Sequence, residues 1–189
     1  MSLAETLRRS LGSRIAEGFF EGAARLGRLH PHARPEAHGI SVTRDVPYDP
    51  ANPFRRLDVW QPAAARAGST APALLYVHGG GFRILSKETH WIMALTFARQ
   101  GFVVFNIDYR LAPKHPFPAA LEDAAEAYAW VVDRAADFHA DAARLVLAGE
   151  SAGANLVAAL TLAACVERPE AFARRVFATG LVPRTVLPA

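Results

Sequence analysis

The chain has 189 residues, of which 51% are hydrophobic and 21% are charged. This composition is typical of a globular protein with one sizeable core, and it excludes a disordered or fibrous chain. The formal net charge is +3. Arginine supplies nearly all of the positive charge and is scattered along the sequence, so we expect no nucleic-acid partner.

The cysteine content and the hydropathy pattern exclude several further classes of protein. The single cysteine, Cys165, cannot form an internal disulfide or a multi-cysteine metal site. It lies on a predicted helix among Ala and Leu, so we expect a small buried residue, and its isolation fits a reducing compartment such as the cytoplasm. No window of about 18 apolar residues is present, so we expect no membrane span.

The first 39 residues predict a helix followed by a linker. Large apolar side chains recur every fourth residue, at Leu3, Leu7, Leu11, Ile15 and Phe19. This spacing is typical of an amphipathic helix packed on its own domain, which we expect over residues 2–28. The stretch 30–39 has two prolines and no periodicity, so we interpret it as a linker.

From residue 40 onward, strands alternate with helices. Strands are expected at 40–46, 55–61, 73–78, 102–109 and 144–149, with the start of a further strand near 176. Helices are expected at 88–100, 119–136 and 151–167. The unbroken apolar runs at 73–78 and 102–109 indicate strands buried on both faces. The order predicts an α/β fold for residues 40–189, with a mostly parallel sheet and helices on both faces.

The stretch LVLAGESAGANL, Leu145 to Leu156, places a serine between two glycines. Where a strand turns sharply into a helix, the residue at the apex is strained and side chains two positions away would collide, which explains Gly149 and Gly153. The Ser151 hydroxyl would then be exposed at the carboxyl edge of the sheet. This context predicts a nucleophilic serine rather than a passive residue in a glycine-rich turn.

A second motif, YVHGGGFRILSKETH, runs from Tyr76 to His90 and has three consecutive glycines at a strand end. Their backbone N–H groups are unshielded and can face a ligand, as an oxyanion hole requires. The glycine spacing fits neither a phosphate loop nor a dinucleotide-binding motif. We expect Gly79 and Gly80 to be the donors and Gly81 to let the loop turn.

A third motif, DYRLAPKHPFPAALED, is rich in proline and predicts a rigid loop before a helix. Asp108, Arg110 and Asp123 could tie neighbouring loops together through ion pairs. We favour this scaffolding role over direct participation in catalysis.

These three motifs resemble the hormone-sensitive-lipase family of α/β-hydrolases, the bacterial esterases with an HGGG box. The likeness covers Ala73 to about Leu156, in the order and spacing of the family. It implies carboxylester hydrolysis through an acyl-enzyme, with Ser151 as the nucleophile. It implies an oxyanion hole built from the amides of Gly79, Gly80 and Ala152. The residues that would support the two motifs are His78, Gly81, Gly149, Glu150 and Gly153.

The resemblance also implies an acyl-ester substrate, no metal and no organic cofactor. Residues 1–39 would form a cap element over the acyl pocket, and residues 40–189 would form the N-terminal part of the α/β-hydrolase core.

The general base that such a serine needs is missing from this sequence. A histidine oriented by a carboxylate must take the proton, and α/β-hydrolases place both after the serine. No histidine follows Ser151, and the only later carboxylates are Glu167 and Glu170. His78 is close to the glycines, but the resemblance assigns it to shaping the loop. We therefore expect a chain that stops before the acid and the histidine and that is inactive alone.

Two other functions are compatible with these motifs. A protein without the base could bind a small ligand on the same fold, and the same nucleophile could hydrolyse amides or remove acetyl groups. The intact Ser151 motif argues weakly against a pure binding protein. An incomplete sheet would also expose an apolar edge near 176–187, through which chains could associate.

Overall fold

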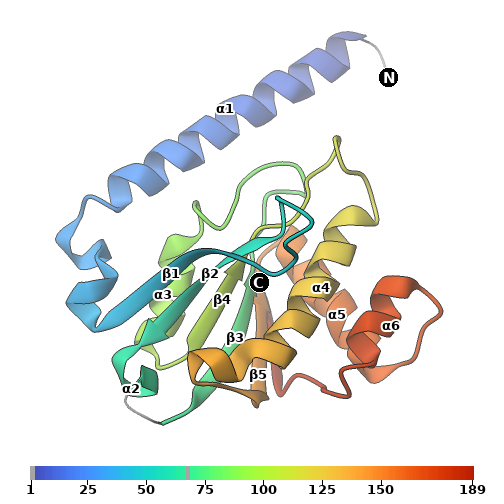
Figure 1. Cartoon of the computed structure of the whole chain (residues 1–189). Coiled ribbons are helices and arrows are strands. Elements are labelled where there is room, and N and C mark those ends of the chain that lie inside the picture. The colour runs from blue at the N-terminus through green and yellow to red at the C-terminus, as the bar shows by residue number, and fades with distance from the viewer. Residues whose placement is uncertain (1–2, 67–68) are drawn as a thin grey trace.

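The computed structural model describes residues 3–66 and 69–189, and Figure 1 shows their arrangement. The chain begins with a long helix, α1 (Leu3–Gly27), that extends beyond the rest of the molecule. Two short 3-10 helices follow, at Pro31–Ala33 and Pro35–His38. The first predicted helix is confirmed, but its predicted packing is wrong at Ile15 and Phe19, which are exposed because this part of α1 extends beyond the core. The stretch interpreted as a linker contains the two short helices.

Within the described residues, the strands form one sheet in the order β1-β2-β4-β3-β5-β6. The strands are β1 (Ile40–Pro47), β2 (Arg56–Pro62), β3 (Ala71–Val77), β4 (Val103–Ile107), β5 (Ala140–Gly149) and β6 (Thr185–Pro188). The pairs β1/β2 and β2/β4 are antiparallel, and the pairs β3/β4, β3/β5 and β5/β6 are parallel. The mostly parallel sheet that the sequence predicts is therefore confirmed.

Helices cover both faces of this sheet (Figure 1). They are the short α2 (Ala63–Arg66), α3 (Trp91–Arg99), α4 (Ala119–Arg134), α5 (Ala152–Cys165) and α6 (Ala171–Phe177). Successive strand residues point to opposite faces. Phe105 packs in the cluster that includes side chains of α4, α5 and α6, whereas Val104 packs in the cluster that includes side chains of α3.

Two expectations for the last part of the chain are wrong. The segment near 176 is helical, because Ala173 and Val176 lie three residues apart on one face of α6 and are buried against α4 and α5. The strand, β6, begins only at Thr185. Cys165 is exposed rather than buried. It is the last residue of α5, beyond the part of that helix that packs in the core.

The proline-rich segment is held by an ion pair, as the sequence suggests. Arg110 Nε lies 2.9 Å from each carboxylate oxygen of Asp123, which is fully buried. Arg55 Nε also donates to Asp123, at 2.7 Å. Asp108 takes no part in this pairing, because its carboxylate accepts the backbone N–H of Lys87 instead.

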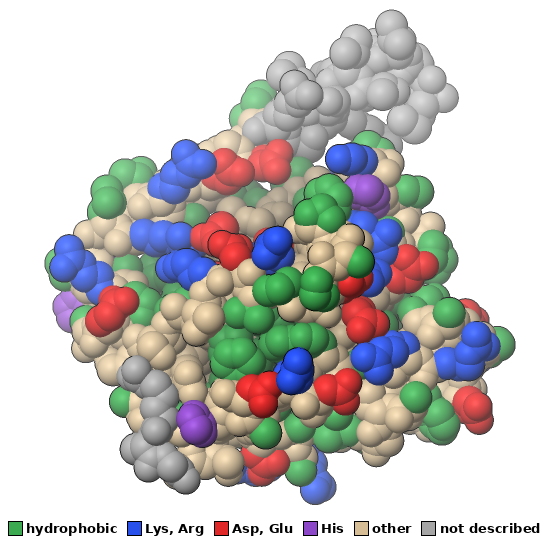
Figure 2. Space-filling view, in the orientation of Figure 1, with side chains coloured by type: hydrophobic (Ala, Val, Ile, Leu, Met, Phe, Trp, Pro, Cys, Tyr) green, Lys and Arg blue, Asp and Glu red, His purple; other side chains and the backbone are tan. Residues whose placement is uncertain are grey.

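Charged side chains of both signs are mixed on the surface. Figure 2 shows Lys and Arg interspersed with Asp and Glu on the face drawn there. None of the helices in the described part of the chain combines the length and the hydropathy that a membrane span requires.

Candidate active site

Ser151 lies at the turn between β5 and α5. Its backbone angles, φ 51° and ψ −112°, fall in a region that residues other than glycine rarely adopt. Its side chain is exposed. The strained turn thus lies where the sequence predicts it, and it presents the hydroxyl to solvent at the carboxyl end of β5.

The two glycines around Ser151 leave no space for a side chain. A Cβ atom at Gly153 would lie 2.0 Å from the carbonyl oxygen of Val77, at the end of β3. A Cβ atom at Gly149 would lie 2.6 Å from the carbonyl carbon of Gly153. The turn is therefore packed directly against the neighbouring strand, and both positions require glycine.

The glycine loop after β3 forms the second wall of the site. Gly80 and Gly81 have φ values of 108° and 60°, and a Cβ atom at Gly80 would lie 2.0 Å from the carbonyl oxygen of Ile84. The carbonyl of Gly80 accepts the N–H groups of Arg83 and Ile84 at 3.1 and 3.2 Å, which closes the loop. Gly79 lies against the serine turn, since its Cβ atom would meet the Glu150 carbonyl oxygen at 2.9 Å.

Three backbone donors in this region have no acceptor. Across the described residues, no hydrogen bond is formed by the N–H of Gly79, Gly80 or Ala152. Gly79 and Ala152 are buried, and Ala152 is the first residue of α5, where the helix dipole favours negative charge. An unpaired N–H at a buried position is costly, so an acceptor placed beside these groups would be stabilising.

Glu150 links the serine turn to the segment that follows the glycine loop. His90 Nε2 donates to Glu150 Oε1 at 2.8 Å, and His90 Nδ1 lies 2.9 Å from the hydroxyl of Thr89 and 3.1 Å from the carbonyl of Ser86. This pair was not predicted from the sequence. Glu150 was expected only as motif support, and no local signal shows that His90 approaches a residue 60 positions later.

His78 is positioned to shape the loop. It is 1% exposed, its Nδ1 lies 2.7 Å from the carbonyl of Gly79, and its ring stacks on Tyr109 at 4.3 Å. Burial lowers the pKa of His78 to about 3. Asp108 Oδ1 lies 3.9 Å from Nε2, and burial raises the pKa of Asp108 to about 6. In the ranges described, no side chain forms a hydrogen bond with the Ser151 hydroxyl.

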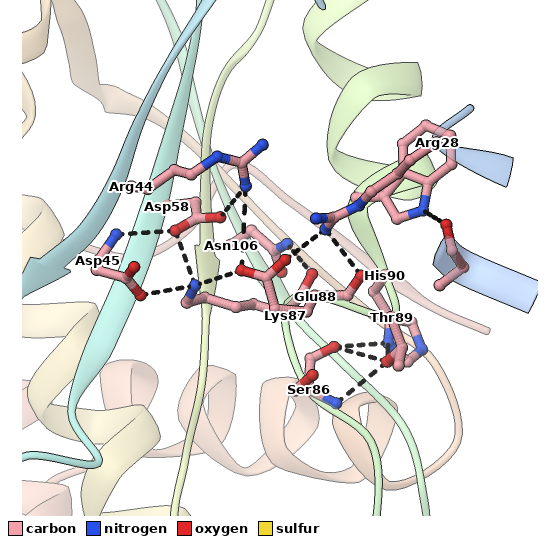
Figure 3. A network of polar contacts seen from close by, with 12 residues as sticks. Arg28, Arg44, Asp45, Asp58, Ser86, Lys87, Glu88, Thr89, His90 and Asn106 are labelled. Carbon is pink, nitrogen blue, oxygen red and sulfur yellow. Dashed lines mark hydrogen bonds and ion pairs between the residues drawn. The ribbon is translucent and has the colours of Figure 1, made fainter. Parts of the chain in front are cut away.

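A charge network fixes the segment 86–90 (Figure 3). Lys87, whose side chain is only 3% exposed, lies 2.9 Å from a carboxylate oxygen of each of Asp45, Asp58 and Glu88. Burial opposes the charge of Lys87, but the three carboxylates outweigh it and raise its pKa. Sequence analysis missed this network, because its members come from segments far apart in the chain.

The same network fastens the end of α1 to the core. Arg28 Nη2 lies 2.5 Å from Glu88 Oε2 and 2.9 Å from the Glu88 carbonyl oxygen. Trp91 Nε1 donates to the carbonyl of Ala24 at 3.2 Å. Burial would raise the pKa of Glu88, but hydrogen bonds from Lys87 and Arg28 lower it to about 2.

A cavity of about 370 Å³ adjoins the glycine loop and α5. Its lining includes Gly81, Phe82, Phe117, Leu121, Asn155 and Leu156. Arg83, Arg110 and His115 also line it, but most of its surface is apolar, and Asn155 and Leu156 place it beside the helix that follows Ser151. Among the residues described, no group of three or more His, Cys, Asp or Glu side chains is placed to hold a metal ion.

Comparison with known proteins assigns the family. Residues 74–183 match the model of the alpha/beta hydrolase fold family. The chain belongs to this family. The expected likeness to the hormone-sensitive-lipase group is confirmed by relatives of this α/β-hydrolase that are named esterase, carboxylesterase and hormone-sensitive lipase.

Three of these relatives show the extent of the match. Esterase LipI of Mycobacterium tuberculosis is 37% identical over 135 residues, which cover 70% of this chain and 42% of that protein. Hormone-sensitive lipase of Homo sapiens is 36% identical over 115 residues, which cover 60% of this chain and 11% of that protein. The crystal structure of esterase LipW from Mycobacterium marinum superposes with a TM-score of 0.67 at 32% identity, over 94% of this chain and 52% of that chain.

This α/β-hydrolase thus spans less than half the length of the curated relatives LipI and the carboxylesterase NlhH, 42% and 45% respectively. Its three motifs lie inside the matched region.

Proposed function

We propose that this α/β-hydrolase supplies the nucleophile and the oxyanion hole of a serine carboxylesterase. The observation that carries the proposal is the strained Ser151 turn beside three backbone N–H groups without acceptors. Relatives named esterase or lipase support ester hydrolysis as the class of reaction. The mostly apolar cavity beside the turn suits a short acyl chain.

In this proposal, Ser151 Oγ attacks the carbonyl carbon of an ester and loses its proton to a general base. The carbonyl oxygen becomes an oxyanion and accepts hydrogen bonds from the amides of Gly79, Gly80 and Ala152. Collapse of this intermediate breaks the ester C–O bond, and the protonated base returns the proton to the leaving alcohol. Water then hydrolyses the acyl-enzyme by the same steps. His78, Gly81, Gly149, Glu150 and Gly153 hold this geometry.

We infer that the base lies outside these 189 residues. A histidine with a pKa of about 3, such as His78, is a poor proton acceptor for a serine hydroxyl. His90 already donates to Glu150, and its ring packs on His78 and Tyr76 rather than on Ser151. The 189-residue chain should therefore form an acyl-enzyme slowly and hydrolyse it slowly.

Two further features belong to this proposal. Residues 1–39, with α1, act as a cap element attached to the core 40–189 through Arg28 and Trp91. The outer edge of β6, the last strand in the sheet order among the described residues, is a surface for self-association, since an unpaired strand edge can add another strand.

The test is acylation of the 189-residue chain by p-nitrophenyl butyrate, followed by peptide mapping. We expect a butyryl group on Ser151 that accumulates faster as pH rises, because hydroxide replaces the missing base. The Ser151→Ala variant should lose this adduct, whereas Ser69→Ala, at an exposed loop serine, should keep it.

Two outcomes would contradict the proposal. One is equal acylation of the same peptide in Ser151→Ala. The other is turnover at ordinary enzyme rates, about 1–10³ s⁻¹, that disappears in His78→Ala, which would identify His78 as the base.

A further inference from the structure

A second cavity, of about 420 Å³, adjoins the cavity near Ser151 and shares Arg83, Ala112 and His115 with it. It is formed by the turn before β2, the segment that follows the glycine loop and the loop after β4. We call it the basic pocket and define it by Phe54, Arg56, Arg83, Asp108, Lys114 and His115. Neither Ser151 nor a glycine of the loop contributes to its lining.

The positive charges of the basic pocket lack carboxylate partners among the described residues. In the part of the chain that the structure describes, no carboxylate forms an ion pair with Arg56, Arg83 or Lys114. Arg56 Nη1 donates to the carbonyl of Asp45 at 3.0 Å, and Lys114 Nζ lies 5.1 Å from the ring centre of Phe54. These three cations therefore remain free to attract an anion.

Several other cations of the described residues are paired with carboxylates. Arg28, Arg44, Arg55 and Arg110 each pair with a carboxylate, and so does Lys87. Among the described residues, Arg34, Arg99, Arg174 and Arg184 also lack a carboxylate partner, but none of them lines this pocket, where three unpaired cations share one hollow. A concave surface with excess charge of one sign concentrates ions of the opposite sign.

Asp108 is the one carboxylate in the pocket lining, and it does not neutralise these cations. Its Oδ1 accepts the backbone N–H of Lys87 at 2.7 Å, and its side chain is 30% exposed. Three positive side chains therefore face one carboxylate that already has a hydrogen-bond partner.

His115 adds an aromatic surface to the lining, next to Phe54. Its Nε2 atom is buried and has no hydrogen-bond partner. The ring packs edge-on against Phe54, with the ring centres 5.1 Å apart. A buried polar atom without a partner is unusual and costs free energy. Because this nitrogen is not accessible from the pocket, His115 contributes ring surface to the lining rather than a hydrogen bond.

The remaining lining defines the body of the ligand. Phe54, Leu85, Tyr109 and Leu111 present apolar surface between the cations. The volume of about 420 Å³ is within the range of small-molecule sites. A ligand with a flat apolar body and one negatively charged group would match both kinds of lining.

We propose that the basic pocket binds a small organic carboxylate, with Arg56, Arg83 and Lys114 around the carboxylate group and Phe54 and His115 against the apolar body. The site is distinct from Ser151, and the proposal holds whether or not Ser151 is a nucleophile.

The test is calorimetric titration of the 189-residue chain with benzoate and with benzamide. The two probes have nearly the same shape, but only benzoate is charged. We expect benzoate to bind and benzamide not to bind, and we expect the affinity for benzoate to fall as salt rises. Binding of both probes alike, or of neither, would overturn the proposal.

Three variants locate the site. Arg83→Gln and Lys114→Gln should each weaken benzoate binding by about two- to fivefold, the effect of losing one partly exposed ion pair. Arg99→Gln removes the same charge from an exposed position of α3 and should leave binding unchanged. Unchanged affinity in both pocket variants would overturn the assignment.

Amide chemical shifts separate this site from the proposed oxyanion hole. Benzoate should shift the amide signals of Phe54, Leu85 and Lys114. If it shifts only those of Gly79, Gly80 and Ala152, benzoate binds beside Ser151 and the basic pocket is not its site.

Discussion

Replacing Lys87 with methionine removes the central charge of the network in Figure 3 but keeps the length of the side chain. The change leaves Asp58, which is 1% exposed, without its ion pair to Nζ at 2.9 Å. Asp58 keeps the N–H of Asp45 at 2.9 Å and Arg44 Nη1 at 3.2 Å. The variant therefore contains a buried carboxylate that is only partly compensated.

The size of the effect follows from this geometry. Removing one partner of a buried ion pair typically costs about 3–5 kcal/mol of unfolding free energy. Because Arg44 and a backbone N–H remain on Asp58, we expect the lower end, about 3 kcal/mol. The chain has only one other lysine, Lys114, which is exposed and contacts the face of Phe54. Lys114→Met should therefore cost no more than about 1 kcal/mol.

The pH dependence gives a second test of the network. The pKa of Glu88 is about 2 in the folded chain, below its ordinary value, so its ionised form stabilises the fold above about pH 4.5. This contribution is lost as pH falls toward 2. Lys87→Met removes one of the two cations that lower this pKa. Ionised Glu88 therefore contributes less unfolding free energy in the variant, and acid removes less of it. The difference in unfolding free energy between the unmodified chain and Lys87→Met should therefore be smaller at pH 3 than at pH 7.

Urea denaturation followed by tryptophan fluorescence at both pH values measures these differences. The reasoning is refuted if Lys87→Met loses no more stability than Lys114→Met. It is also refuted if the loss is the same at pH 3 and pH 7.

Three further predictions concern the turn, the pocket and the sheet edge. Gly153→Ala places a Cβ atom 2.0 Å from the carbonyl oxygen of Val77, so it should lower the unfolding free energy measured in urea by about 3 kcal/mol or more. Gly22→Ala should lower it by nothing, because a Cβ atom there meets nothing within 4 Å. Burial raises the pKa of Asp108 to about 6, so ionisation of this group opposes folding. The melting temperature of Asp108→Asn minus that of the unmodified chain should therefore rise from about pH 4 to pH 7. A difference that stays constant with pH would contradict this. Leu187→Lys, on the exposed edge of β6, should reduce self-association in sedimentation velocity, and an unchanged distribution would place the contact elsewhere.

Local patterns in the sequence determined most of the fold and the centre of the candidate site. The unbroken apolar runs in β3 and β4 require burial on both faces, and that requirement fixes their place inside a parallel sheet. Gly149 and Gly153 mark the strained turn because a side chain at either position collides with neighbouring backbone. Such features could be recognised because their cause lies within a few residues of chain.

The segment near 176 shows where local patterns fail. Its apolar residues fit a short strand or one face of a helix equally well. The choice depends on what lies beside it, and α4 and α5 offer a surface onto which Ala173 and Val176 of a helix can pack. The strand β6 lies further along the chain, where Thr185 pairs with Val146 of β5.

Only the tertiary structure decided how the charges are arranged. The sequence shows Lys87, Asp45 and Asp58 as ordinary polar residues of separate segments, and nothing in it places their charged atoms 2.9 Å apart. The same holds for His90 and Glu150, and for the three unpaired cations of the basic pocket. The physical reason is that an ion pair depends on the distance and burial of its partners, and strand order and sheet register set both quantities for residues far apart in the chain.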